Sequence, residues 1–119
     1  MTPMALWTRY AATWSLPADV RTGELKVCVA DDVVYCDANR TLEGSSSLSE
    51  YMGGFQSTVP GGRFQIISVV HHHGRMLAHW NLIGPEGQNL QAGASFATAA
   101  SDGRLQNISG FFALGETGP

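Results

Sequence analysis

The fold is decided by the stretch Ala30-Asp31-Asp32-Val33-Val34-Tyr35-Cys36-Asp37. This pattern is typical of a helix end that runs directly into a short strand. Because side chains alternate across a strand, Val33, Tyr35 and Asp37 are predicted to share one face. An acid held among apolar and aromatic neighbours is costly to ionise, so its pKa tends to rise. Proton-transfer bases are often built in this way, and Asp37 is therefore the first candidate site residue.

A simpler interpretation of Asp37 stays open. The residue also begins the loop Asp37-Ala38-Asn39-Arg40. An aspartate at such a position commonly hydrogen-bonds the backbone of its own turn. The stretch alone does not separate a catalytic acid from a turn residue.

The first half of the chain has helical periodicity. Apolar residues at three-four spacing predict a first helix that ends at Leu16-Pro17 and a second helix over about 18–30. A third helix is predicted from about Ser47, because Ser47-Leu48-Ser49-Glu50 has the capping-box arrangement. The expected buried faces are, in order, Leu6, Trp7, Tyr10, Ala11 and Trp14; Val20, Leu25 and Cys28 or Val29; and Leu48, Tyr51, Met52 and Phe55.

The second half predicts four strands over 64–72, 76–83, about 89–99 and 105–114, followed by a frayed tail from residue 115. Short turn signals separate the strands, so successive strands must be antiparallel neighbours. Helices followed by a β meander predict a single α+β domain. Its three N-terminal helices pack on one face of a curved, mostly antiparallel sheet.

The composition excludes several classes of partner. A net charge of −3 with seven Lys and Arg argues against nucleic acid and against an anionic membrane surface. No apolar run approaches the roughly 20 residues that span a bilayer. We see no secretion signal and expect Cys28 and Cys36 to be free thiols in a reducing cytoplasm. Charged residues make up 14% of the chain, where about a quarter is usual, which predicts surface hidden in a homodimer, a ligand cavity or both.

Four segments carry a family resemblance: Arg9-Tyr10-Ala11-Ala12, the stretch 30–37, Ser101-Asp102-Gly103-Arg104-Leu105, and Gly110-Phe111-Phe112. With the order of elements, they resemble the nuclear transport factor 2-like superfamily, which includes ketosteroid isomerases and SnoaL-like polyketide cyclases. The resemblance spans nearly all of residues 1–119 and implies one cone-shaped α+β domain. It does not choose an activity, because this superfamily hosts isomerases, dehydratases, epoxide hydrolases, cyclases and non-catalytic binding proteins.

The resemblance also implies roles for three residues. Asp37 falls where ketosteroid isomerases carry their general base, and Tyr10 falls where they place a tyrosine that donates to the developing oxyanion. Such a pair takes a proton from a carbon beside a carbonyl and stabilises the negative charge that appears on oxygen. Ser95 falls where those enzymes, and SnoaL-like cyclases, carry a second acid. A serine hydroxyl is a weaker donor, which is a departure from the family pattern.

Other side chains are weaker candidates. His71, His72 and His73 alternate across a strand, so at most two converge, and we predict no metal site. One histidine could line a cavity, and His72 is favoured because it shares parity with Ile66 and Val70. Trp80 could be either a core or dimer-face aromatic or a wall of the pocket. Phe55 is expected to shape the pocket beside it.

The sequence therefore predicts a small cytoplasmic enzyme that needs no cofactor. It would bind an apolar, ring-containing carbonyl compound between helices and sheet, with Asp37 as general base or acid and Tyr10 as donor. Trp80, Phe55, Ser95 and His72 would contact the substrate. One alternative is epoxide hydrolysis on the same scaffold, for which only the turn pair Asp102 and Arg104 is available. The other alternative is a non-catalytic ligand-binding or dimerisation module.

Overall fold

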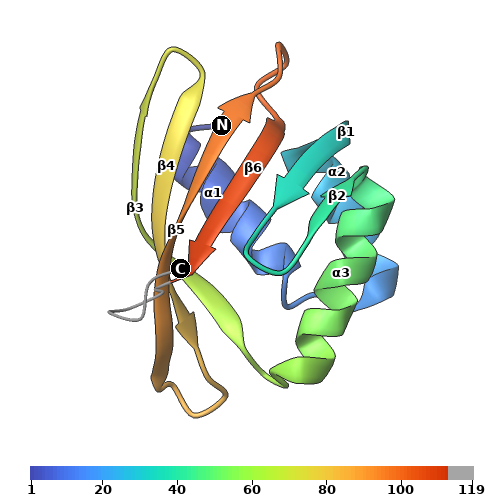
Figure 1. The fold of residues 1–119 in the computed structure, drawn as a ribbon, viewed down its shortest axis with the longest axis vertical. Coiled ribbons are helices and arrows are strands. Elements are labelled where there is room, and N and C mark those ends of the chain that lie inside the picture. The colour runs from blue at the N-terminus through green and yellow to red at the C-terminus, as the bar shows by residue number, and fades with distance from the viewer. Residues whose placement is uncertain (113–119) are drawn as a thin grey trace.

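The computed structural model describes residues 1–112, and three helices lie on one side of a six-stranded sheet in it (Figure 1). The helices are α1 (Pro3–Thr13), α2 (Ala18–Cys28) and α3 (Ser45–Thr58). The strands are β1 (Val29–Cys36), β2 (Thr41–Glu43), β3 (Arg63–His72), β4 (Arg75–Ile83), β5 (Asn89–Ala99) and β6 (Leu105–Phe112). The predicted α+β class and the four strands of the second half are confirmed. The expected extension to residue 114 and the tail lie outside the described residues.

The sheet has the strand order β2-β1-β6-β5-β4-β3. Its four long C-terminal strands pair antiparallel through short turns, as predicted. The β1 strand pairs in parallel with β6, so the first and last strands within residues 1–112 lie side by side. The short β2, which the sequence did not indicate, pairs with the edge of β1 through Tyr35↔Leu42. Asp37, which directly follows β1, therefore lies next to β6, a central strand of the sheet.

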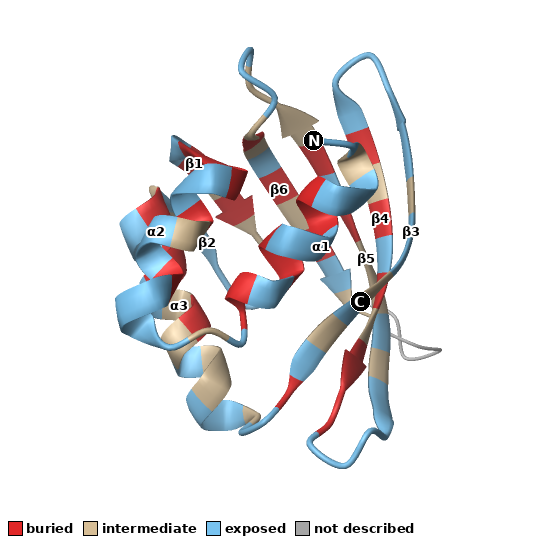
Figure 2. Ribbon diagram, turned by 180° about the vertical axis from the view of Figure 1, so that it is seen from behind, coloured by how far each residue is buried: buried red, intermediate tan, exposed pale blue. Residues whose placement is uncertain are grey.

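Helix α1 contributes more buried residues to the helical layer than α2 or α3. Thr2 caps its N-terminus, where the Thr2 Oγ1 accepts a hydrogen bond from the Ala5 N–H at 3.1 Å, and Pro3 occupies the first helical position. Its predicted apolar face is buried, and Trp14 ends the helix as its C-cap. Seen from the helix side, buried positions run along α1 and along the strands behind it (Figure 2). The hydrophobic core lies between these helices and the sheet.

Helix α2 differs from the prediction in its inward face. Leu25 and Cys28 are fully buried, but Val20 is 51% exposed. Arg21 is buried instead. Its Nε donates to the Ser49 Oγ of α3 at 3.0 Å and its Nη1 donates to the Leu16 carbonyl at 3.0 Å. A long side chain that satisfies two polar groups between helices thus displaces valine from the interior.

Helix α3 begins two residues before the predicted capping box. Its N-cap is Gly44, with φ of +96° and no side-chain cap, so the capping-box prediction was wrong. The Gly44 N–H donates to the Val33 carbonyl of β1 at 2.7 Å, which fixes the start of the helix against the sheet. The apolar stripe is confirmed at Leu48 and Met52, which are fully buried. Tyr51 and Phe55 are half-buried and pack against the core.

A bulge in β3 overturns the parity on which the His72 prediction rested. The register with β4 shifts between Ile66 and Ser68, so inward and outward positions exchange after that point. Val69 consequently packs against the core, whereas Val70 is 60% exposed. His72 shares its face with Val70 and is exposed at the end of the strand.

No helix among residues 1–112 is long and apolar enough to cross a membrane. The same residues contain no cluster of three or more His, Cys, Asp or Glu side chains that could hold a metal ion.

Candidate active site

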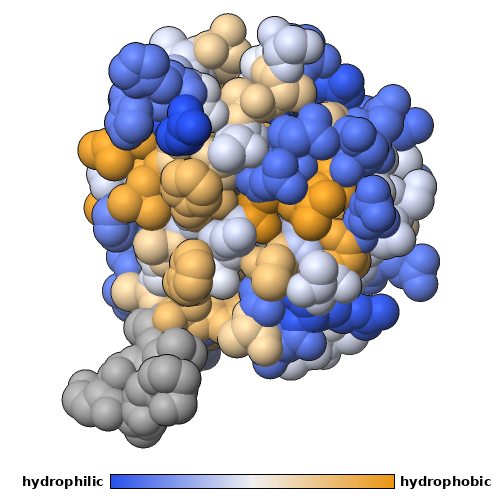
Figure 3. All heavy atoms as spheres, turned by 45° about the horizontal axis from the view of Figure 1, so that its top comes forward, coloured by the Kyte–Doolittle hydropathy of each residue, from blue (hydrophilic) through white to orange (hydrophobic). Residues whose placement is uncertain are grey.

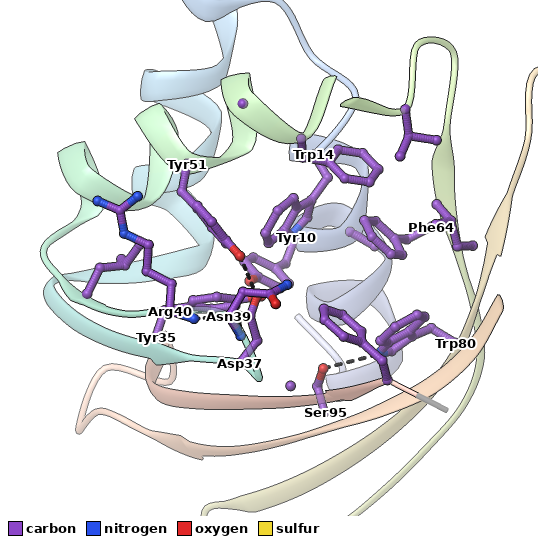
Figure 4. Close-up of a pocket in the computed structure, with 18 of the residues that line it drawn as sticks. Tyr10, Trp14, Tyr35, Asp37, Asn39, Arg40, Tyr51, Phe64, Trp80 and Ser95 are labelled. Carbon is purple, nitrogen blue, oxygen red and sulfur yellow. Dashed lines mark hydrogen bonds between the residues drawn. The ribbon is translucent and has the colours of Figure 1, made fainter. Parts of the chain in front are cut away.

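A cavity of about 760 Å³ opens between α1, α3 and the inner face of the sheet (Figure 4). Asp37 lies at its floor and is 9% exposed. The other acid on the cavity wall, Glu50, is exposed, and so is Arg40. Asp37 is therefore the one buried carboxylate among the described residues that line the cavity.

The Asp37 carboxylate accepts four hydrogen bonds, divided evenly between its two oxygens. The backbone N–H groups of Asn39 and Arg40 donate to Oδ1 at 2.8 and 3.0 Å. The hydroxyls of Tyr35 and Tyr51 donate to Oδ2 at 2.8 and 2.9 Å. A carboxylate offers about four lone-pair sites, so these donors occupy all of them. The interpretation of Asp37 as a turn residue is therefore confirmed for Oδ1. Oδ2 faces the cavity, where a catalytic role stays a prediction.

Strand alternation and the α3 stripe bring the two phenols to this oxygen. Tyr35 lies two residues before Asp37 on the same face of β1, and Tyr51 projects from α3 across the cavity. Burial is the main cause that raises the pKa of both hydroxyls, and the bond to Asp37 acts in the same direction. The pKa of Tyr51 rises to about 12, and that of Tyr35 moves well above its usual range. Both phenols remain donors at neutral pH.

Tyr10 lines the same cavity but takes no part in this network. Its side chain is 4% exposed, and its hydroxyl has no hydrogen-bond partner within residues 1–112. Burial raises the pKa of Tyr10 well above its usual range, so the O–H stays protonated. A buried hydroxyl without an acceptor costs about 1–3 kcal/mol. A ligand oxygen that reached it would relieve that cost.

Ser95 and Trp80 form a second polar pair on the sheet side of the cavity. The Trp80 Nε1–H donates to the Ser95 Oγ at 3.0 Å, and both side chains are buried. Because the Ser95 oxygen acts as acceptor, its own O–H is free to donate to another group. The indole fits because residue 93, directly opposite on β5, is glycine. A Cβ at Gly93 would lie 2.3 Å from the Trp80 Cζ2.

Aromatic rings form most of the remaining wall. Trp14 contacts Tyr35, Phe55 and Phe64, with ring centroids 5.8, 5.6 and 5.5 Å apart. Phe55 stacks on Phe64 with centroids 5.0 Å apart, and Phe64 meets Trp80 edge-on at 5.1 Å. At the mouth, the Arg40 guanidinium lies 5.9 Å from the centre of the Tyr51 ring. The cavity is thus an aromatic chamber whose buried polar side chains, Asp37 and Ser95, lie at the floor.

The structure brings five of the six candidate residues to the cavity, namely Asp37, Tyr10, Trp80, Phe55 and Ser95. The sixth, His72, lies outside the cavity, where its Nδ1 is 3.2 Å from the His73 Nδ1. What the five residues do there stays a prediction. Sequence reasoning missed the hydrogen bonds of Tyr35 and Tyr51 to Asp37. The shared strand parity of Tyr35 and Asp37 was a signal for the first bond. For Tyr51, the sequence pattern indicated only a place in an apolar stripe.

Comparisons with known proteins define the family. The sequence matches the SnoaL-like domain family over residues 7–108. The chain therefore belongs to the SnoaL-like family, and the resemblance to the nuclear transport factor 2-like superfamily is confirmed. A comparison with curated protein sequences gives no match.

Solved structures share the fold at low sequence identity. A provisionally named isomerase of the SnoaL-like family from Agrobacterium tumefaciens C58 matches with a TM-score of 0.86 and 22% identity, over 92% of this chain and 95% of that one. A protein with a ketosteroid isomerase-like fold from Catenulispora acidiphila, in complex with trimethylamine, matches with a TM-score of 0.76 and 15% identity, over 96% and 88%. A provisionally named SnoaL-like polyketide cyclase from Jannaschia sp. CCS1 matches with a TM-score of 0.75 and 16% identity, over 96% and 90%. These likenesses establish the fold.

Proposed function

We propose that the protein is a cofactor-free proton-transfer enzyme, of isomerase or cyclase type, for an apolar carbonyl compound that contains a ring. The observation that carries the proposal is Asp37, the single buried carboxylate among the described residues that line the aromatic cavity. Aromatic walls suit a flat apolar ligand, and a buried acid within reach of it is a general base or acid. The neighbours of known structure that are provisionally named isomerase and cyclase fit this proposal.

In the proposed reaction, the Asp37 Oδ2 takes a proton from the carbon beside the ligand carbonyl. The electron pair of the broken C–H bond forms a carbon–carbon double bond, and the carbonyl oxygen becomes an enolate oxygen. Tyr10, whose hydroxyl has no acceptor within residues 1–112, donates to that oxygen, and the O–H of Ser95 provides a weaker second bond. Asp37 then returns the proton to a different carbon, so the carboxylate is regenerated without a redox partner.

The reaction requires one phenol to release the Oδ2, because Tyr35 and Tyr51 both donate to it in the free protein. Tyr51 is the residue that we expect to move. It is only half-buried and stands at the mouth, whereas Tyr35 is 5% exposed within β1. A ligand that enters past Arg40 would meet Tyr51 first.

The second candidate function is a non-catalytic ligand-binding module. The observation that favours it is the saturation of the Asp37 carboxylate by four internal donors, which leaves no lone pair directly available to a ligand. Epoxide hydrolysis has less support. The Asp102 Oδ2 accepts from the Arg104 Nε at 2.8 Å in an exposed turn, and neither residue lines the cavity.

Turnover of cyclic enones and β,γ-unsaturated ketones tests the proposal, together with binding of phenols that mimic an oxyanion. We expect Asp37→Asn to lower kcat roughly 10²- to 10⁴-fold, the usual contribution of general acid–base catalysis. Tyr10→Phe should weaken phenol binding. Asp102→Asn removes a carboxylate outside the cavity and should leave the rate unchanged. Phenol binding without any turnover, and no effect of Asp37→Asn, would establish the binding module instead.

We also propose a homodimer formed through the outer face of the sheet. Apolar side chains gather on that face (Figure 3). Val70, Leu77 and Phe96 form one cross-strand row. On β6 the residue opposite Phe96 is Ser109, and Phe111 lies two residues further along the same face, opposite Ala94. Phe96 and Phe111 are 40% and 57% exposed. Light scattering should give twice the monomer mass for the parent and the monomer mass for Phe111→Glu, with Val27→Glu on α2 as a control that stays dimeric.

We propose a cytoplasmic location because Cys28 and Cys36 are both free thiols in the structure. Fractionation of cells that express the protein would test this, and recovery outside the cytoplasm would contradict it.

A further inference from the structure

Gly110, which has no side chain, lies on the floor of the cavity between the polar side chains of Asp37 and Ser95. Gly110 on β6 lies directly opposite Ser95 on β5. On its other side, β1 pairs with β6 up to Cys36↔Ser109, so Asp37 follows level with Gly110. All three residues are buried and line the cavity. Asp37 and Ser95, both labelled in Figure 4, thus flank a residue that has no side chain.

Neither the backbone nor the packing requires glycine at this position. The φ angle of Gly110 is not among the positive ones. A Cβ built on Gly110 would lie 3.6 Å from the Ser95 Oγ, 3.7 Å from the Asp37 Cβ and 3.7 Å from the Tyr35 hydroxyl oxygen. These are ordinary van der Waals contacts, in contrast to the 2.3 Å approach at Gly93. The absence of a side chain at Gly110 instead leaves a recess in the floor.

The recess has the width of one ligand group. Neighbouring strands lie about 4.8 Å apart, so the backbones of Asp37 and Ser95, two strands apart, are separated by roughly 10 Å. A group resting on Gly110 has the Asp37 carboxylate on one side. On the other side it has the Ser95 O–H, which the Trp80 indole leaves free to donate. A flat carbonyl or phenol end fits this arrangement, because it can present an oxygen to Ser95 and a C–H or O–H to Asp37.

We infer that Gly110 is the specificity-determining position of the cavity: the reacting end of the ligand rests on its bare Cα, between Asp37 and Ser95. This inference rests on the proposed function and narrows its substrate class. The ligand is a ketone, enone or phenol whose reacting end is flat and carries no branch. The bulk of its rings lies toward Phe55, Phe64 and Trp80.

Gly110→Ala tests this inference with one added methyl group. Binding of phenol, 2-naphthol and cyclohex-2-enone would be measured by NMR titration, together with enone turnover. We expect Gly110→Ala to weaken binding or lower kcat/KM roughly 10- to 200-fold, the discrimination that one methylene produces in a closed pocket. Its unfolding midpoint should stay at or above that of the parent, because no contact becomes too close.

Gly54→Ala is the matched control for lost cavity volume. Gly54 also lines the cavity but is exposed on α3, and a Cβ there meets no atom within 4 Å. The same methyl at the mouth should lower affinity far less than at Gly110. Equal effects of the two substitutions, or binding to Gly110→Ala that matches the parent, would overturn the inference and leave the proposed function intact. A parent protein that binds none of the three probes would overturn both.

Discussion

Replacing Tyr35 by phenylalanine should destabilise the protein more than the same change at Tyr51, although both hydroxyls donate to the Asp37 Oδ2. Each change removes one hydroxyl and leaves the ring in place. A hydrogen bond to a charged group contributes about 1.5–3 kcal/mol. Tyr35 is 5% exposed, so water replaces its hydroxyl less readily than at Tyr51, and we expect a loss of about 2–3 kcal/mol. Tyr51 is half-buried at the mouth, where water can take over the bond, and we expect about 1 kcal/mol or less.

Urea unfolding followed by tryptophan fluorescence measures both losses. With a slope of about 1–3 kcal/mol per molar urea, a loss of 2 kcal/mol lowers the midpoint by roughly 1 M. The same two changes in an Asp37→Asn background complete a double-mutant cycle. Without the charge, the loss at Tyr35 should shrink toward the roughly 0.5–1.5 kcal/mol of a neutral hydrogen bond. Equal losses at the two tyrosines, or a Tyr35 loss that does not change in the Asp37→Asn background, would refute this reasoning.

Two further predictions concern Tyr51 and Gly93. Tyr51 should titrate with a pKa of about 12 by ultraviolet absorbance, and Asp37→Asn should lower that pKa because the carboxylate bond helps to raise it. Since the folded pKa lies above the usual value near 10, the stabilisation from Tyr51 is complete below pH 10 and is lost as the pH rises through about 12. The urea midpoint of Tyr51→Phe should therefore fall less steeply between pH 9 and 12 than the midpoint of the parent. Gly93→Ala should destabilise the protein by about 1–3 kcal/mol, because the added Cβ would overlap the Trp80 ring. The control Gly23→Ala in α2, where a Cβ meets no atom within 4 Å, should stabilise the protein by up to about 1 kcal/mol. Equal unfolding midpoints for the two variants would contradict the overlap at Gly93.

The parts of this fold that could be predicted depend on local periodicity. The alternation of Val33, Tyr35 and Asp37 sets one face of β1, and the three-four spacing from Leu6 to Trp14 sets one face of α1. Both signals act within a single element, where a two-residue or 3.6-residue repeat directly fixes direction. The fold class followed because short turns leave antiparallel pairing as the only option for β3 to β6.

The parts that could not be predicted depend on contacts between elements. The bulge after Ile66 inserts one residue into β3, and no residue in that run indicates it, so His72 was placed on the wrong face. Gly44 begins α3 because its N–H reaches β1, which a capping motif read along one segment does not include. The bond from Tyr51 to Asp37 joins residues 14 apart on different elements. Burial of Arg21 similarly depends on acceptors supplied by α3 and the α1–α2 connection.

The structural role of Asp37 would support the catalytic role that we propose for it. Because backbone N–H groups of its own turn hold Oδ1, the carboxylate cannot rotate freely, and Oδ2 points to the cavity before any ligand arrives. Asparagine preserves the turn by placing its carbonyl oxygen at the Oδ1 position, and its amide group then faces the two phenols. Alanine would remove both functions together. A loss of turnover in Asp37→Asn with the fold intact would therefore be due to Oδ2 alone. For this reason that substitution, and not Asp37→Ala, separates the proposed catalytic role from the structural one.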